Sequence, residues 1–159
     1  LAERATGASF YDLVRDRVCV PAGMQDTEFM RSDELPRRAA LGYLSDSSRT
    51  NVFHLPVRGS GDGGIYSTVA DFNSFWGALF AGSIVSEEMV AELVRPRSDR
   101  YGLGFWLGPD EAVALEGYDA GVSFRSVRDP VRQITHTVIS NTSAGAWPLT
   151  RLLAEQLAT

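Results

Sequence analysis

The chain has 159 residues, of which 44% are apolar and 22% are charged, and its formal net charge is −5. This length and composition argue against disorder and predict that residues 1–159 form a single domain with a hydrophobic core. Because no basic run is present and the longest apolar stretches are about ten residues, the sequence excludes non-specific nucleic-acid binding and a membrane-spanning helix.

The chain contains one cysteine, Cys19, and no lysine. A single thiol cannot form an internal disulfide, and the apolar run 18–20 indicates that Cys19 is a buried small side chain. Without lysine, the 159 residues cannot supply a phosphate-binding P-loop or a Ser-x-x-Lys nucleophile pair. The glycine-rich run 59–64 therefore predicts a sharp turn rather than a phosphate site.

The first expected elements are helical. Residues 1–6 read as the end of a helix that Gly7 closes, and this helix lacks an N-terminal capping residue. Because there is also no initiator methionine, we expect the natural chain to extend upstream. The Ser9-to-Asp12 stretch resembles a capping box and starts a helix over about residues 9–18, which Pro21 and Gly23 are expected to end.

The middle of the chain divides into a loop and two helices. Residues 25–64 show no sustained period and are rich in Asp, Ser, Arg, Pro and Gly, which predicts a long surface excursion with short helical or extended pieces. A second capping box at 68–71 begins a helix over about residues 69–81 with an aromatic face. A shorter helix is expected over 86–94, with acidic residues in its first turn.

The last third of the chain reads as strands and one helix. Strand-like runs separated by turns occupy residues 101–108, 112–116, 122–127 and 134–140. Short links between consecutive strands predict an antiparallel meander. A final helix is expected from Trp147-Pro148, with its buried face made by Leu149, Leu152, Leu153 and Leu157. The predicted fold class is therefore α+β.

The two histidines, His54 and His136, indicate no metal centre, because neither has Asp, Glu or Cys partners at ligand spacing. We expect no metal and no cofactor. A Ser-His-Asp triad assembles in three dimensions, so spacing does not test it, and nothing in the sequence selects one serine.

Three stretches resemble motifs of the serine β-lactamases, the penicillin-binding proteins and related esterases, in that family's order and spacing. They are residues 10–27, 61–71 and 101–106. The resemblance implies a β-lactamase/transpeptidase-like α+β fold, in which an antiparallel sheet is shared between the two ends of the chain and packed by helices. It also implies that this chain is the C-terminal half, with the N-terminal strands and the nucleophile helix preceding Leu1.

The family's mechanism uses a serine in Ser-x-x-Lys that forms an acyl-enzyme, a Tyr-x-Asn element, and a third motif, Lys-Thr-Gly or His-x-Gly, on the oxyanion side. The first two motifs are absent from these residues. Tyr43-Leu44-Ser45 has a Tyr-x-Ser shape, but it lies where the family has a surface loop.

Residues 116–126 resemble the third motif, Gly-His-x-Gly-Gly-x-x-Gly-Phe-x-Ser. Tyr118 stands where His or Lys is expected, and Ala120 stands where the first Gly is expected. Tyrosine can donate a hydrogen bond but carries no positive charge at neutral pH, which puts recognition of a β-lactam carboxylate in doubt. The expected catalytic groups are Tyr118 and the backbone N–H of Gly121, which would face a developing oxyanion.

The resemblance implies further substrate contacts, with Arg125 binding a carboxylate. These residues are Asp119, Ala120, Ser123 and Arg125. The competing interpretation is that residues 117–121 only form a hairpin turn.

We therefore expect a fragment of a serine hydrolase that acts on an amide or ester and whose partners are a small-molecule or peptide substrate and the missing N-terminal half. One alternative is a non-catalytic, degenerate or truncated homologue that acts as a binding module. Another is an unrelated α+β domain. Loss of half a sheet would leave a free strand edge, which predicts oligomerisation or poor solubility of the isolated chain.

Overall fold

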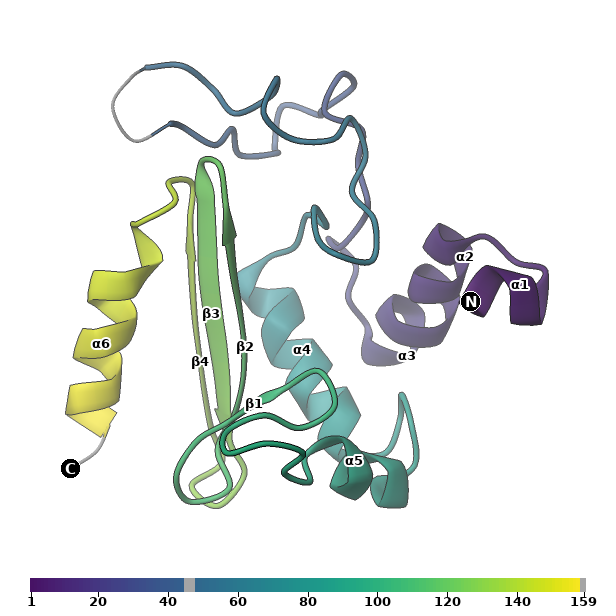
Figure 1. The fold of residues 1–159 in the computed structure, drawn as a ribbon, viewed down its shortest axis with the longest axis vertical. Coiled ribbons are helices and arrows are strands. Elements are labelled where there is room, and N and C mark those ends of the chain that lie inside the picture. The colour runs from purple at the N-terminus through teal and green to yellow at the C-terminus, as the bar shows by residue number, and fades with distance from the viewer. Residues whose placement is uncertain (45–47, 158–159) are drawn as a thin grey trace.

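The computed structural model of the chain describes residues 1–44 and 48–157. A four-stranded antiparallel sheet lies between helix α4 on one face and helix α6 on the other (Figure 1). The helices are α1 Ala2–Thr6, α2 Phe10–Val14, the π-helix η1 Arg15–Cys19, α3 Val20–Ala22, α4 Val69–Phe80, α5 Glu87–Leu93 and α6 Ala146–Leu157. Between α3 and α4 the described residues form no helix and no strand of the sheet, although isolated β-bridges such as Glu28 with Tyr66 are present. The predicted excursion therefore has short extended pieces, and no helical ones in its described part, and it lies across one end of the sheet. The predicted α+β class is confirmed.

The helix predicted over 9–18 runs further, through α2, η1 and α3 to Ala22, so the prediction that Pro21 ends it is wrong. Proline has no N–H and its ring crowds the carbonyl four residues earlier in a regular helix. The turn before it is widened to a π-helix, in which the Val20 N–H donates to the Arg15 carbonyl. Gly23, with φ of 69°, ends the helix in the left-handed conformation that glycine adopts without a steric penalty.

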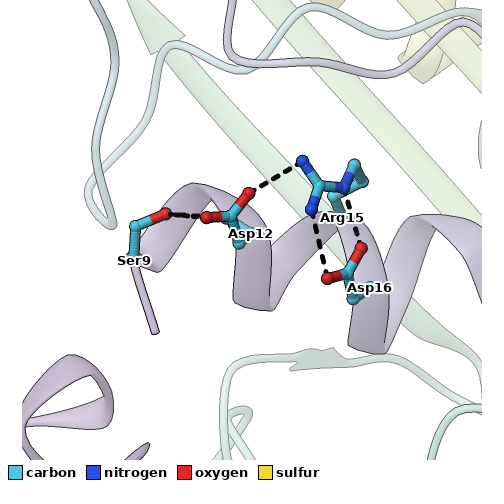
Figure 2. A network of polar contacts seen from close by, with 4 residues as sticks. All are labelled: Ser9, Asp12, Arg15 and Asp16. Atoms are coloured by element: carbon cyan, nitrogen blue, oxygen red, sulfur yellow. Dashed lines mark hydrogen bonds and ion pairs between the residues drawn. The ribbon is translucent and has the colours of Figure 1, made fainter. Parts of the chain in front are cut away.

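The start of α2 carries an exposed polar network (Figure 2). The Asp12 N–H donates to Ser9 Oγ at 3.1 Å, and the Ser9 hydroxyl donates to Asp12 Oδ2 at 2.7 Å. Arg15 then pairs with Asp12 and with Asp16, each at 2.7 Å. The Ser9 hydrogen bond, followed by the charge of Arg15, lowers the pKa of Asp12. Because water screens exposed ion pairs, this network fixes the helix start more than it adds stability.

The predicted capping box at 68–71 is half right. Thr68 Oγ1 accepts the Asp71 N–H at 3.1 Å, as an N-cap should. The buried Asp71 carboxylate does not return to Thr68; it accepts the Asp26 N–H at 2.8 Å and the Thr27 hydroxyl at 2.6 Å. The start of α4 thus holds the chain that follows α3.

The hydrophobic core lies between α4, α5 and one face of the sheet, around Trp76, which is fully buried. Its other buried members are Leu79, Val90, Phe105 and Val113. The Trp76 indole N–H donates to Ser126 Oγ at 2.8 Å, and that hydroxyl shares a second bond of 2.7 Å with Thr137 Oγ1. The indole polar group is therefore satisfied inside the core, as burial requires.

The sheet has the order β1-β2-β3-β4. The strands are β1 Trp106–Leu107, β2 Val113–Asp119, β3 Val122–Asp129 and β4 Ile134–Ser140. Strand β1 is much shorter than the predicted run 101–108. It pairs with Val113 and Ala114 of β2, and its Trp106 also forms an isolated bridge with Tyr101. Strand β2 continues to Asp119, so the stretch predicted as a turn at 117–121 is reduced to Ala120 and Gly121.

Helix α6 forms as predicted but turns a different face to the sheet. Leu149 and Leu152 are 54% and 51% exposed, whereas Ala146 and Thr150 are buried. The predicted leucine face is therefore wrong for these two residues. The buried positions are spaced four residues apart and are small, which lets the helix axis approach the sheet.

Candidate functional site

All the residues predicted for the third motif lie on the hairpin formed by β2 and β3. Asp119 pairs with Val122, so only Ala120 and Gly121 form the turn. Gly121 is buried and has φ of 70°. A Cβ at this position would come within 2.9 Å of the Tyr43 nitrogen, so no other residue fits here without movement of the backbone.

Two segments far apart in the sequence hold this turn. Asn51 Nδ2 donates to the Ala120 carbonyl at 2.9 Å. The loop after β4 contacts the turn through Ser143 and is itself tied to the first segment, because the Tyr43 N–H donates to the Asn141 carbonyl at 2.9 Å. The end of the hairpin is thus a packed, ordered part of the molecule rather than a free loop.

Both backbone N–H groups of the turn have partners inside the protein. The Ala120 N–H donates to Oδ1 of Asp119 at 2.6 Å. The Gly121 N–H donates to Ser143 Oγ at 2.9 Å, and the Ser143 hydroxyl donates in turn to the Asp119 carbonyl at 2.7 Å. In this arrangement the Gly121 N–H is not open to a substrate, so its predicted oxyanion role stays a prediction that requires Ser143 to withdraw.

Tyr118 points to the face of the sheet that α6 covers. Its side chain is 75% exposed and packs edge to face against Trp147 of α6, with 6.2 Å between ring centroids. Successive side chains of a strand point to opposite faces, so Asp119 lies on the other face, toward α4. The two residues therefore do not converge on one point.

Ser123 has a structural position. It is fully buried, its hydroxyl donates to the Thr142 carbonyl at 2.7 Å, and its Oγ accepts the Ala146 N–H at 3.1 Å. It thereby ties β3 to the first residue of α6. In this arrangement Ser123 exposes no surface through which it could make the predicted substrate contact.

Arg125 forms an ion pair with Glu116 on the neighbouring strand, and both side chains are half-buried. The pair lines a cavity of about 610 Å³ between the sheet and α6, together with His136 and Thr150. Burial, followed by the charge of Arg125, lowers the pKa of His136, which favours the neutral imidazole. The carboxylate that Arg125 binds in the structure is that of Glu116.

Ser143 and Asn51 were missed by the sequence interpretation. Each reaches the turn through a side-chain bond to backbone, across 22 and 69 residues respectively. No spacing rule marks such contacts. Of Tyr43-Leu44-Ser45, the Ser45 position lies outside the described residues, and the Tyr43 N–H is used in the tie to Asn141.

Within residues 1–44 and 48–157, no group of three or more His, Cys, Asp or Glu side chains could hold a metal ion. In the same part of the chain, no helix combines the length and the apolar character that crossing a bilayer requires.

Comparison with known proteins identifies the family. The model of the family described as Beta-lactamase matches residues 1–158, so the chain belongs to this family. The crystal structure of a penicillin-binding protein from Bacillus halodurans is similar with a TM-score of 0.90 and 32% identity, covering 97% of this chain and 52% of that one. An octameric penicillin-binding protein homologue from Pyrococcus abyssi shares the fold with a TM-score of 0.74 at 22% identity, covering 96% of this chain and 39% of that one.

Among proteins known by sequence, Protein Rv1367c of Mycobacterium tuberculosis is 31% identical over 153 residues, which is 83% of this chain and 36% of that protein. The chain spans 27% to 36% of the length of the curated relatives it matches. Family membership and the likeness to penicillin-binding proteins support a relation of this chain to the serine hydrolases.

Proposed function

We propose that this chain is the C-terminal part of a serine hydrolase that cleaves an amide or ester through an acyl-serine intermediate. The nucleophile lies outside these 159 residues. The chain contributes one wall of the cleft, formed by the β2–β3 hairpin and the segments that hold it. Residues 1–159 form the C-terminal portion of one β-lactamase-like domain.

The observation that carries this proposal is the combination of a family match over residues 1–158 with the complete absence of lysine. A Ser-x-x-Lys pair activates its serine through the adjacent amine, so this pair requires a lysine. The family fold is present over the whole chain, whereas the activating residue is not. The edge of β2 beyond Ala114, which β1 leaves unpaired, is the surface on which a substrate would be placed.

The substrate-side roles follow from the geometry. Gly121 provides an oxyanion donor once its N–H is released, and Ala120 and Asp119 flank it. The side chains of Tyr118 and Arg125 lie on the sheet face that α6 covers, and we propose a catalytic role for Tyr118 and binding of a substrate carboxylate for Arg125. We propose a small-molecule or peptide substrate, and the chemistry of these residues requires no cofactor.

A second candidate is a non-catalytic homologue that only binds a partner. Two observations favour it: Tyr118 stands where the family's third motif has a cationic residue, and the Gly121 N–H is already bonded. The two candidates differ in whether an upstream Ser-x-x-Lys exists and reacts.

Steady-state and burst kinetics of a version extended upstream test the proposal. It should hydrolyse at least one of a p-nitrophenyl ester, a D-alanyl peptide and a chromogenic cephalosporin, with a burst that marks the acyl-enzyme. The 159-residue chain should hydrolyse none of them. If the extended protein lacks both the Ser-x-x-Lys motif and activity, the binding-module candidate replaces this one.

A further inference from the structure

We propose that Ser143 is a positioning residue of the candidate site: its hydroxyl occupies the Gly121 N–H in the resting protein and withdraws when a substrate oxyanion forms. This inference rests on the proposed function. It assigns a role to a residue outside the third motif, on the loop between β4 and α6.

The Ser143 hydroxyl accepts the Gly121 N–H in the way that a substrate oxyanion would. Its oxygen lies 2.9 Å from the Gly121 nitrogen, within the 2.7 to 3.1 Å range that oxyanion donors keep to the oxygen they stabilise. The same hydroxyl donates to the Asp119 carbonyl at 2.7 Å, so it bridges the carbonyl before the turn and the N–H inside it. A substrate oxygen cannot use the Gly121 N–H while this bridge is closed.

The bridge can open without movement of the backbone. A serine side chain has three staggered positions about its Cα–Cβ bond, and rotation of that single bond withdraws the oxygen. Ser143 is half-buried and Asp119 is exposed, so water can take over the partners that Ser143 leaves. The turn itself stays in place, because Asn51 holds the Ala120 carbonyl independently.

The energetic balance favours opening only when charge develops. The bond between Ser143 and Gly121 joins two neutral groups, whereas a bond from the same N–H to an oxyanion is charge-assisted and roughly twice as strong. A neutral substrate carbonyl therefore competes poorly with Ser143, and the tetrahedral oxyanion competes well. Ser143 thus leaves the Gly121 N–H to the substrate only when the oxyanion has formed, which is when that hydrogen bond lowers the activation barrier.

The test compares Ser143→Ala, Ser143→Thr and the matched control Ser83→Ala in the protein extended upstream. Thr keeps the hydroxyl, and Ser83 is an exposed serine after α4, away from the hairpin. Two quantities are measured: hydrogen exchange of the Gly121 amide by ¹⁵N spectroscopy, and the burst-phase rate of acylation by a p-nitrophenyl ester. Exchange of amides in β3 reports whether each variant is folded.

We expect Ser143→Ala to accelerate both Gly121 exchange and acylation by about three- to tenfold, the range that one neutral hydrogen bond corresponds to. Ser143→Thr and Ser83→Ala should match the wild type. If Gly121 exchange accelerates while acylation is unchanged or slower, Ser143 is only a structural tie and the inference fails, although the proposed function stands. If the wild-type protein forms no acyl-enzyme, the proposed function fails and this role of Ser143 fails with it.

Discussion

Cys19 is a residue whose chemistry is set by its surroundings. It is 5% exposed, and burial, followed by the negative charge of Asp71, raises the pKa of its thiol. Because the thiolate is the reactive form, we expect iodoacetamide to alkylate the folded protein at least about tenfold more slowly than the protein in urea. Equal rates in the two conditions would show that Cys19 is accessible.

His136 makes stability depend on pH. Its pKa is lowered in the folded state, so the unfolded chain takes up a proton first as the pH falls through about 6.5. The free energy of unfolding should therefore decrease over this interval and level off below the folded-state pKa. The carboxyl groups whose pKa values are lowered, Asp12, Asp33, Asp62 and Glu88, act in a more acidic range.

Urea unfolding at about pH 7.5 and 5.5 measures this effect in the wild type and in His136→Gln. The glutamine variant should lose the part of the pH dependence that lies near 6.5. The same pH dependence in both proteins would mean that the half-buried imidazole of His136 does not contribute.

At the residue scale, the sequence predicted the burial of a side chain better than it predicted hydrogen-bond partners. The apolar neighbours of Cys19 indicated a buried side chain, and that prediction is confirmed. The partners of Gly121 and Ala120 could not be predicted, because Ser143 and Asn51 are brought to the turn by the fold as a whole. A side-chain hydrogen bond to backbone leaves no periodic signal in the chain.

At the scale of elements, the start of α4 combines two functions in neighbouring residues. Thr68 caps the helix, and Asp71 holds Asp26 and Thr27. We expect Thr68→Ala to cost about 1 kcal/mol of unfolding free energy, as N-cap losses do. Asp71→Ala should cost more, about 2 to 3 kcal/mol, because it leaves a backbone N–H and a hydroxyl without their charged partner.

Urea unfolding of the two variants beside Ser83→Ala measures the difference, and the exposed control should stay within about 0.5 kcal/mol of the wild type. If Asp71→Ala costs no more unfolding free energy than Thr68→Ala, Asp71 does not hold the chain after α3 against α4 as described.

The helix starts were predictable because capping residues act locally. Ser9, Thr68 and Ser86 each accept a backbone N–H in the first turn of the following helix. The passage of the helix through Pro21 was not predictable, since it depends on the widened turn of η1. The face of α6 was misjudged because leucines were counted as buried, whereas close approach to the sheet selects the smaller Ala146 and Thr150.

At the scale of the whole molecule, the described sheet leaves strand edges uncovered, and one face of helix α6 is uncovered as well. Strand β4 pairs only with β3 among the described strands, and the outer side of α6 exposes Leu149 and Leu152. Free edges and apolar patches promote association. We predict that the isolated 159-residue chain forms oligomers or precipitates.

Size-exclusion chromatography with light scattering tests this prediction, and Leu149→Glu combined with Leu152→Glu should shift the chain toward monomer. A monodisperse wild-type monomer that melts cooperatively would contradict it, and would show that the chain is self-sufficient.

The family could be predicted from the sequence, because three motifs in order mark it over most of the chain, and the match to residues 1–158 confirms it. The conformation of the third motif could not be predicted from the sequence. Whether 116–126 is an open oxyanion strand or a closed hairpin depends on Ser143, on the position of β1 and on the length of the turn. Those features arise only when residues 41–51 and 141–145 meet at the end of the sheet.

The most direct test of the central claim is the intact mass of the 159-residue chain and of the upstream-extended chain, after incubation with an active-serine phosphonate probe and with a penicillin. We predict a covalent adduct on the longer chain alone, which would place the nucleophile upstream of Leu1. An adduct on the 159-residue chain would mean that one of its own serines is activated, and it would contradict the division of roles proposed for the two halves.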